Sequence, residues 1–256
     1  MNPGVLPFGI LACDVLEFEV LARIERLGLK PVKVRFLAMG QHDFPARLHD
    51  ELQEAVSEME AAGCRRIILV YGLCSNSILG LTTESAELIM PRAHDCITLF
   101  LGSKERYAEL MKKEPGTYWF SPGWCRGKRV PGPDHMKELE AQYRKQFEDE
   151  EDVEYLMEIE QEKYAHYRVA GYTDLGDGPL DQAMADTRTA AGFLDMEFVH
   201  HKGDDRLLND LLTGPWDEAR YLVVPPGQAA ISSADELIIR CSGCQVRNRD
   251  NPSSGS

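Results

Sequence analysis

The sequence predicts an α/β fold built from two Rossmann-like halves with parallel sheets and a long acidic helical insertion. Three observations predict it: apolar segments alternate with amphipathic ones early in the chain, the stretch 138–162 is helical and strongly acidic, and strand and helix patterns return after residue 178. Such alternation forms parallel sheets with right-handed crossovers. We therefore expect an N-terminal half over 1–130, a helical arm over 131–170, a second half over 171–245 and a disordered tail over 246–256.

Strands and helices alternate in the first half. Buried apolar runs predict the strands, and apolar residues three or four apart predict the helices. The first two helices end at Gly28 and Gly63, and glycine is typical of a helix C-terminus. A short strand and a turn follow at 117–124. The predicted strands cover 5–13, 31–39, 65–72 and 96–101, and the helices cover 14–28, 44–63 and 103–113.

The segment from Pro133 to Tyr167 has a different character. Residues 138–162 contain eleven acidic side chains and two basic ones, Arg144 and Lys145. Helices with a run of like charges are typical of a solvated surface and also of a docking site for a partner. Two alternatives therefore stay open: a solvated helical hairpin, or an acidic arm that docks another protein.

The second half repeats the strand and helix pattern. The order strand, acidic turn, helix and strand in 195–224 resembles the order in 32–71, which is consistent with an ancient duplication. Helices are predicted over 178–193 and 204–214, and strands over 195–201 and 219–227.

Composition excludes several classes of protein. The formal net charge is −14, and nonspecific nucleic-acid binding needs a basic surface. No apolar run approaches the ~20 residues of a membrane span, and the N-terminus lacks the pattern of a secretory signal. We therefore expect a cytoplasmic protein.

The sequence contains seven cysteines, and this odd number argues against a disulfide framework. The thiols are therefore core residues, metal ligands or redox groups.

The cysteines give the most specific functional prediction. Cys13 follows the first predicted strand, and Cys74 follows the third. Strands one and three are neighbours in a doubly wound sheet, and ligands bind beyond the carboxyl ends of the strands where the strand order reverses. We therefore expect both thiols to lie close together at this switch point.

The sequence His94-Asp95-Cys96 supplies two more candidates. In extended backbone, residues two apart point to the same face, so His94 and Cys96 can face one ion. With Cys13 and Cys74 they make a Cys3His set, which favours zinc, with iron or cobalt as alternatives. Because this segment precedes the predicted fourth strand, it can also lie at the opposite edge of the sheet, which argues against Cys96 in particular.

Other roles stay open for the thiols. Free cysteines often act as small buried hydrophobic residues, and Cys74 is also a candidate nucleophile or redox thiol because a helix start lowers a thiol pKa. Cys64 is interpreted as structural. Cys241 and Cys244 form a single CxxC, which is weak evidence for zinc because such sites usually use a second pair.

The turn after residue 101 is a candidate anion-binding site. Gly102 and Ser103 begin a predicted helix beside Lys104 and Arg106. Free backbone N–H groups and the helix dipole favour an anion there, and the alternative is a simple helix cap.

Aromatic residues mark a second candidate ligand site. Tyr118, Trp119 and Trp124 lie beside a Pro-Gly turn at a strand end. They are either core residues or the wall of a pocket that stacks a flat ligand or holds a cation. His200 and His201 end a strand in the second half and can face the same cleft.

Four segments together resemble the family called domain of unknown function 1638. They are LACDVLEFEV, YGLCSNSILGL, PRAHDCITLFLGSKERY and GTYWFSPGW, and WDEARYLVVPPG resembles the closing strand of the family. The resemblance covers residues 7–227 and implies that Cys13, Cys74, His94 and Cys96 belong to the family pattern. Family members are often associated with microbes that use methylamines through corrinoid-dependent methyl transfer, which implies a role near cobalamin or one-carbon chemistry.

We therefore expect a protein that holds a transition metal at the sheet switch point and is linked to corrinoid-dependent methylamine or one-carbon metabolism. If it is an enzyme, the metal would activate a thiol or amine substrate as a Lewis acid. The sequence contains no P-loop, GxGxxG, HExxH or GxSxG motif that would indicate another catalytic class. The alternative is a non-catalytic accessory or small-ligand-binding protein whose acidic arm docks a methyltransferase or corrinoid protein. Either protein can be a homo-oligomer.

Overall fold

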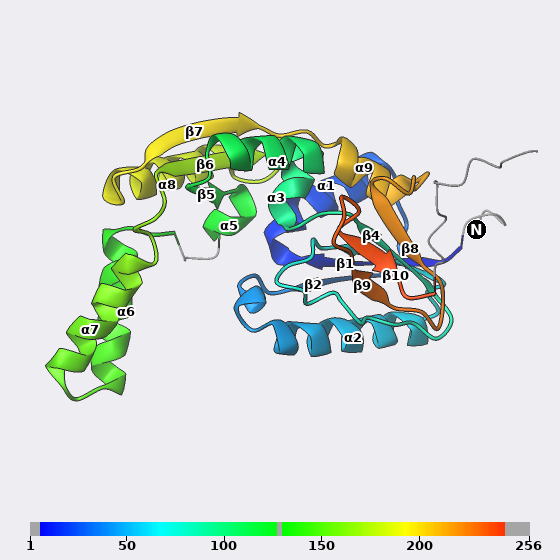
Figure 1. Ribbon diagram of the computed structural model, residues 1–256, viewed down its shortest axis with the longest axis horizontal. Coiled ribbons are helices and arrows are strands. Elements are labelled where there is room, and N and C mark those ends of the chain that lie inside the picture. The colour runs from blue at the N-terminus through cyan, green and yellow to red at the C-terminus, as the bar shows by residue number, and fades with distance from the viewer. Residues whose placement is uncertain (1–5, 127–129, 244–256) are drawn as a thin grey trace, which may run out of the picture.

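The computed structural model describes residues 6–126 and 130–243, and it has a mixed α/β fold with parallel sheets (Figure 1). The predicted tail over 246–256 lies outside the described residues. Within the described ranges, no helix is both long and apolar enough to cross a membrane.

The first sheet has five strands in the order β2-β1-β3-β4-β8. The first four pair in parallel, and β8 pairs with β4 in the antiparallel direction. Because β2 and β3 lie on opposite sides of β1, the strand order reverses between β1 and β3, as predicted. The strands are β1 Phe8–Cys13, β2 Lys33–Leu37, β3 Arg66–Val70, β4 Glu87–Pro91 and β8 Tyr221–Val224.

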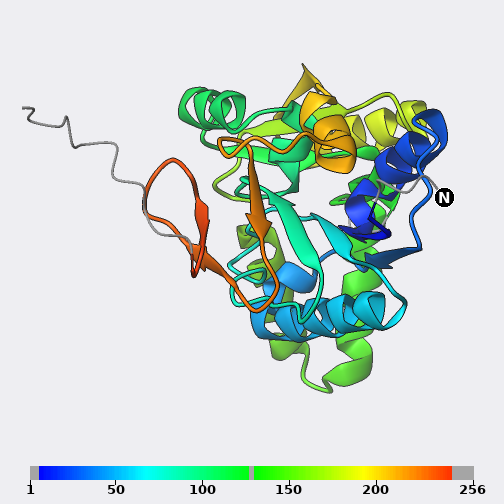
Figure 2. The same ribbon diagram turned by 90° about the vertical axis from the view of Figure 1, so that its right-hand side faces the viewer.

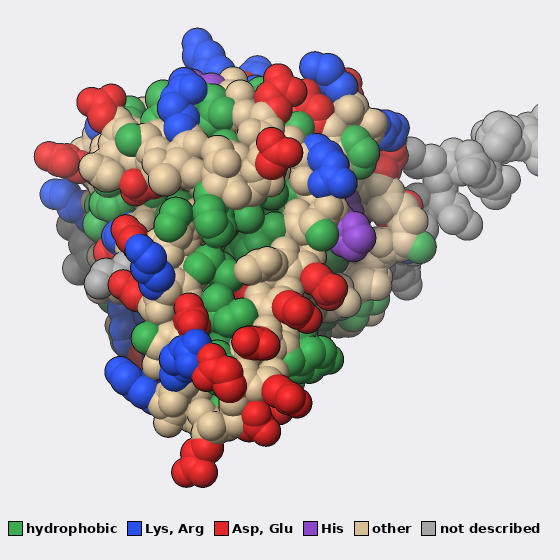
Figure 3. Space-filling view, turned by 90° about the vertical axis from the view of Figure 1, so that its left-hand side faces the viewer, with side chains coloured by type: hydrophobic (Ala, Val, Ile, Leu, Met, Phe, Trp, Pro, Cys, Tyr) green, Lys and Arg blue, Asp and Glu red, His purple; other side chains and the backbone are tan. Residues whose placement is uncertain are grey.

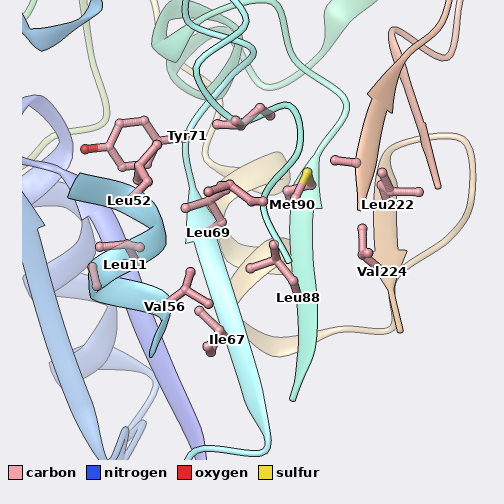
Figure 4. Packing of buried hydrophobic residues seen from close by; sticks show 14 of the residues in the cluster. Leu11, Leu52, Val56, Ile67, Leu69, Tyr71, Leu88, Met90, Leu222 and Val224 are labelled. Carbon is pink, nitrogen blue, oxygen red and sulfur yellow. The ribbon is translucent and has the colours of Figure 1, made fainter. Parts of the chain in front are cut away.

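Helices cover both faces of the first sheet, because successive strand residues point to opposite sides. Leu11 and Leu69 share a hydrophobic cluster with Leu52 of α2 (Figure 4). Ile10 and Ile68 belong to the cluster on the other face, with side chains from α1 and α9. In both views of the ribbon, α2 and α9 lie on opposite sides of the strands (Figure 2). These helices are α1 Glu17–Arg26, α2 Pro45–Ala61 and α9 Arg206–Thr213.

The second sheet has three parallel strands in the order β5-β6-β7. Ala183 and Ala190 of α8 share a buried cluster with Ala170 and Tyr172 of β6. The strands are β5 Thr117–Phe120, β6 Val169–Asp174 and β7 Glu197–Lys202, and the remaining helices of this region are α3 Cys96–Leu101, α4 Lys104–Lys113, α5 Pro122–Arg126 and α8 Leu180–Phe193.

The two sheets divide the strands differently from the predicted halves. The sequence places β5 with the N-terminal half, but β5 pairs with β6. It places β8 with the second half, but β8 pairs with β4. The chain therefore leaves the first sheet after β4 and returns to it only at β8. The pattern of apolar residues does not distinguish these memberships, because strands in both sheets are apolar.

The predicted strand over 96–101 is wrong, because these residues form helix α3 and the fourth strand is Glu87–Pro91. Residues 97–101 are all buried, so the apolar run shows no helical periodicity. The Asp95 side chain accepts hydrogen bonds from two backbone N–H groups of the first turn, and this N-cap determines the helix.

The acidic segment forms a helical hairpin at one end of the molecule (Figure 1). It consists of α6 Pro133–Gln146 and α7 Glu150–Glu162, in which Met136 and Val153 are buried. Arg144 forms ion pairs with Glu140 and Glu150, which joins the two helices. Near the C-terminus, β9 Ala230–Ser232 and β10 Ile239–Cys241 form a small antiparallel pair.

Candidate functional site

Cys13 is the last residue of β1, and Cys74 lies just beyond the end of the adjacent strand β3. β1 and β3 pair from Phe8 with Arg66 to Ala12 with Val70, and Cys13 follows the last pair. Cys74 follows β3, and both cysteines line the same cavity. The strand order on which the predicted convergence depends is confirmed.

The segment 94–96 lies at the same edge of the sheet. It follows β4 instead of preceding a strand, so the argument for the opposite edge does not hold. The backbone N–H groups of Leu73 and Cys74 donate to the carbonyl groups of Ala93 at 2.8 Å and His94 at 3.1 Å. These bonds extend the contact between the β3 and β4 segments and bring 94–96 beside Cys74.

Gly72 permits this close approach. A Cβ atom on residue 72 would lie 2.5 Å from Cα and 2.6 Å from the backbone nitrogen of Asp95, which is closer than real Cβ atoms come. Backbone atoms cannot move aside as the tip of a flexible side chain can. The glycine of the YGLC sequence is therefore required where the chain passes Asp95.

Cys13, Cys74 and Cys96 line one small cavity, which we call the thiol pocket. Its volume is about 40 Å³, and one water molecule needs at least roughly 10–15 Å³, so the pocket has room for only a few water-sized atoms. Trp124 forms another wall, because Gly123 packs directly against the backbone of Val15. The remaining lining residues are Val15, Ala38, Met39, Gly40, Gln41, Leu48 and Tyr71.

Two hydrogen-bond donors belong to residues that line the thiol pocket. Among the described residues, the buried Trp124 indole N–H has no hydrogen-bond partner, and the buried Tyr71 hydroxyl has only the Cys13 thiol. The Tyr71 hydroxyl lies near the Cys13 thiol, which is a weak acceptor. Because buried polar groups are almost always satisfied, these two donors favour an acceptor stronger than a neutral thiol beside them.

Burial raises the pKa of all three thiols. It raises the pKa of Cys13 and of Cys74 to about 12, and the pKa of Cys96 well above its ordinary value. A negative charge on Cys13 raises the pKa of Cys74 further, because two charged thiolates in one pocket repel. Reactive cysteines have a depressed pKa beside a positive group, so the nucleophilic alternative for Cys74 loses support.

The backbone at Cys74 adopts a conformation that is uncommon outside glycine. Cys74, Ser75 and Asn76 have φ angles of 45°, 57° and 68°. Left-handed backbone costs roughly 1–2 kcal/mol for each such residue, and strain of this kind concentrates at functional sites. The Ser77 hydroxyl donates to the Cys74 carbonyl at 2.8 Å, which helps to hold the turn.

Asp95 and Tyr107 fix the segment that carries Cys96. The Tyr107 hydroxyl donates to one carboxylate oxygen of Asp95 at 2.6 Å, and the other oxygen caps α3. The exposed ring of His94 stacks on Tyr107 with the ring centroids 6.1 Å apart. Desolvation raises the pKa of Asp95. One tyrosine therefore contacts both residues that precede Cys96.

A larger cavity adjoins the thiol pocket, and we call it the aromatic cleft. Its volume is about 1060 Å³. Cys74, Cys96 and Trp124 line both cavities. Figure 3 shows hydrophobic side chains gathered in the centre of the hairpin side of the molecule, with acidic and basic side chains around them. The aromatic residues that line the cleft are Tyr118, Trp119, Trp124, Tyr164 and Tyr167.

Gly102 and Ser103 line neither cavity. The Ser103 hydroxyl accepts a hydrogen bond from the Arg106 backbone N–H at 3.0 Å and caps α4, while Gly102 ends α3. The side chains of Lys104 and Arg106 donate to backbone carbonyl groups. These contacts match the helix-cap alternative, and anion binding at this turn stays a prediction.

The other candidate residues lie away from both cavities. His200 is exposed and His201 is buried, and neither lines the thiol pocket or the aromatic cleft. Cys64 is buried in the core. Cys241 is buried in β10, and Cys244 lies outside the described residues.

Metal-ligand geometry is not preformed. Across residues 6–126 and 130–243, no group of three or more His, Cys, Asp or Glu side chains is arranged to hold a metal ion. Cys13, Cys74 and Cys96 nevertheless line one pocket.

Four tyrosines of the site were missed by sequence reasoning. Tyr71 stands in the YGLC sequence three residues before Cys74, and this position was a usable signal. Tyr164 and Tyr167 end the acidic segment three residues apart, as one face of a helical turn. Tyr107 lies in a polar helix whose pattern does not mark a residue that contacts Asp95.

Comparison with protein families identifies the chain. The family model described as Protein of unknown function (DUF1638) matches residues 36–212, which is most of the chain. The chain belongs to the DUF1638 family. The match to DUF1638 includes Cys74, His94 and Cys96, whereas Cys13 lies before it. No curated protein matches the chain significantly, and neither does any solved structure.

Proposed function

We propose that the protein binds a transition metal in the thiol pocket, with the thiolates of Cys13, Cys74 and Cys96 as ligands. His94, at the adjoining cleft, is the fourth ligand in this proposal. Zinc fits a Cys3His set best, and iron or cobalt are the alternatives.

The observation that carries this proposal is the composition of the thiol pocket. Three thiols that lie at or beyond the ends of three neighbouring strands share about 40 Å³ with the Tyr71 hydroxyl and the Trp124 ring, whose N–H has no partner among the described residues. Metal binding removes the thiol protons and leaves thiolates, which accept hydrogen bonds. The Trp124 N–H would then gain an acceptor, and the Tyr71 hydroxyl would gain a stronger acceptor than the neutral Cys13 thiol, which lowers the cost of burying both donors.

The raised thiol pKa values support the same role. Without a positive charge in the pocket, each thiolate is desolvated and repelled by its neighbours. A divalent cation would stabilise the thiolates against this desolvation and repulsion, because a coordinated thiol loses its proton outright. The protein would therefore release protons when it takes up the metal.

The residues around the pocket would prepare it for chemistry. A bound zinc ion would supply Lewis-acid activation of a thiol or amine group. Trp124 would separate the metal from solvent, and the strained turn at Cys74 would hold one ligand where the pocket meets the aromatic cleft. The cleft would bind and orient the small molecule that approaches the pocket.

Three further parts of the proposal rest on the sequence. The link to corrinoid-dependent methylamine or one-carbon metabolism rests on the family resemblance. The two Rossmann-like halves are proposed from the repeated strand and helix order, and the cytoplasmic location from the odd number of cysteines. If no metal binds, we expect the accessory function instead. In that function the acidic hairpin docks a methyltransferase or corrinoid protein.

Elemental analysis tests the metal directly. We expect protein purified without oxygen and without a metal-affinity tag to contain about one zinc, iron or cobalt ion per chain. Cys74→Ser should lose that ion, and Cys125→Ser, which changes a buried thiol outside the thiol pocket, should keep it. Metal-free protein, even after anaerobic reconstitution, would contradict the proposal. A metal content equal in the two variants would contradict the assignment of Cys74.

A further inference from the structure

We infer that the aromatic cleft is a binding site for an organic ammonium ion. The inference concerns a different cavity from the thiol pocket and holds whether or not a metal binds there. It rests on the size of the cleft, on the charges that line it and on the aromatic rings that form its walls.

The size of the cleft indicates an organic ligand. At about 1060 Å³ it lies just above the range of roughly 300–1,000 Å³ that is typical of small-molecule sites. A hydrated inorganic cation would leave most of this volume to water. The ligand must therefore have a body that contacts the walls.

The charges that line the cleft favour a cation. The carboxylates come from four residues, and the single lysine, Lys163, is already paired with Glu160 at 2.6 Å. Glu138 has no ion-pair partner among the described residues. The carboxylates that line the cleft outnumber its one lysine, so the cleft favours a cationic ligand over an anionic one. The lining residues that titrate or carry charge are Asp43, Asp95, Glu138, Glu160, Lys163, His94 and His135.

The aromatic rings supply the second recognition element. Tyr118 lies in the centre, with its ring centroid 5.5 Å from that of Tyr164, 5.1 Å from that of Tyr167 and 6.2 Å from that of Trp124. All these pairs meet edge to face, so the rings do not cover one another's faces completely. A cation within about 6 Å of such a ring face is attracted by its quadrupole.

The acidic hairpin forms one wall of this site. Glu138 and Gln142 come from α6, Glu160 comes from α7, and Tyr164 and Tyr167 come from the turn after it. The opposite wall comes from β5 and from the start of α3. The hairpin therefore has a role in ligand recognition that does not require a protein partner.

A charge-matched pair of probes tests the inference. Benzyltrimethylammonium and phenylacetate share a phenyl body and carry opposite charges. We expect calorimetric titration of the full chain at low ionic strength to show saturable binding of benzyltrimethylammonium and none of phenylacetate. Equal binding of both probes, preferential binding of phenylacetate, or no saturable binding of either would overturn the inference.

Two substitutions with matched controls locate the site. Glu138→Gln and Tyr164→Leu should each weaken binding of benzyltrimethylammonium by about threefold to fivefold, which corresponds to one lost charge or ring contact. Tyr164→Phe keeps the ring and should keep the affinity. Glu154→Gln and Tyr155→Leu, which change exposed residues of α7 outside the cleft, should bind as the natural chain does.

The same titration separates this inference from the metal proposal. The natural chain, after removal of metal with a chelator, should still bind benzyltrimethylammonium within about twofold of the untreated chain, because the proposed contacts are charges and rings of the cleft. If the controls lose as much affinity as Glu138→Gln and Tyr164→Leu, the cation binds elsewhere on the acidic surface and the assignment to this cleft is wrong.

Discussion

Gly72 contacts the backbone of Asp95 so closely that a Cβ atom on residue 72 would lie 2.5 Å from the Asp95 Cα atom. This contact joins the chain after β3 to the chain after β4. It places Cys74 and Cys96 in the same pocket. A backbone contact of a glycine therefore determines where these two thiols lie.

Gly72→Ala should therefore destabilise the protein. We expect a loss of about 1–3 kcal/mol in the free energy of unfolding, because the new methyl group must push backbone atoms apart. Denaturant unfolding measures the change. Gly192→Ala is the matched control, since its Cβ would meet nothing within 4 Å and the residue lies in α8. That control should gain up to about 1 kcal/mol. A Gly72→Ala protein as stable as the natural chain would show that the contact is not tight.

Tyr107→Phe should separate the hydrogen bond to Asp95 from the stacking on His94. The variant loses the 2.6 Å hydrogen bond and keeps the ring. Because a hydrogen bond to a charged group contributes about 1.5–3 kcal/mol, we expect a loss of this size in the free energy of unfolding. Tyr155→Phe, at an exposed position, should lose nothing measurable. If both variants unfold at the same denaturant concentration, Tyr107 does not anchor the segment.

The buried carboxyl group of Glu19 should make stability depend on pH. Glu19 is fully buried in α1, its carboxylate oxygens have no hydrogen-bond partner among the described residues, and desolvation raises its pKa to about 8. The unfolded chain loses this proton near its ordinary pKa, whereas the folded chain keeps it. The stabilising contribution is therefore complete below about pH 4.5 and is lost as the pH rises to about 8, at up to about 1.4 kcal/mol per pH unit.

Unfolding measured at pH 5 and at pH 7.5 tests this dependence. Relative to the natural chain, Glu19→Gln should become more stable as the pH rises, because glutamine has no proton to lose. Glu25→Gln, which changes an exposed residue of the same helix, should follow the natural chain at both values. A constant difference between Glu19→Gln and the natural chain would mean that Glu19 is ionised in the fold.

Ser103→Ala distinguishes a helix cap from an anion site. Removal of the hydroxyl that accepts from the Arg106 backbone should lower the free energy of unfolding by about 1 kcal/mol. If the residue only caps α4, the stability of the natural chain and of the variant should rise equally when phosphate is added. A phosphate effect that disappears in Ser103→Ala would restore the predicted anion site.

The sequence predicted the first sheet better than the second. Repeated strand and helix patterns predict that the first and third strands are neighbours, and this order brings Cys13 and Cys74 to one edge. The strand over 96–101 was mispredicted, because a fully buried run has no period that distinguishes a helix from a strand. The capping side chain of Asp95 carried the missing information.

The aromatic cleft was only partly predictable. Tyr118 and Trp124 stood out because they flank a Pro-Gly turn, and both line the cleft. Tyr164 and Tyr167 follow the C-terminus of α7 and line the same cleft. They lie at least 40 residues from Tyr118 and Trp124 in the sequence, and no local sequence pattern predicts such a long-range contact. The pairing of β5 with β6 escaped prediction for a related reason, since partner choice depends on the whole chain.

The return of β8 to the first sheet has a consequence for how the protein is made. A ribosome releases β1 to β4 long before β8, which lies about 130 residues beyond β4 in the chain. Until then the β4 edge exposes unpaired backbone groups, which are a template for aggregation. A fragment that ends before Tyr221 would keep that edge open permanently. Only a chain synthesised through Val224 can therefore cover the β4 edge of its own first sheet.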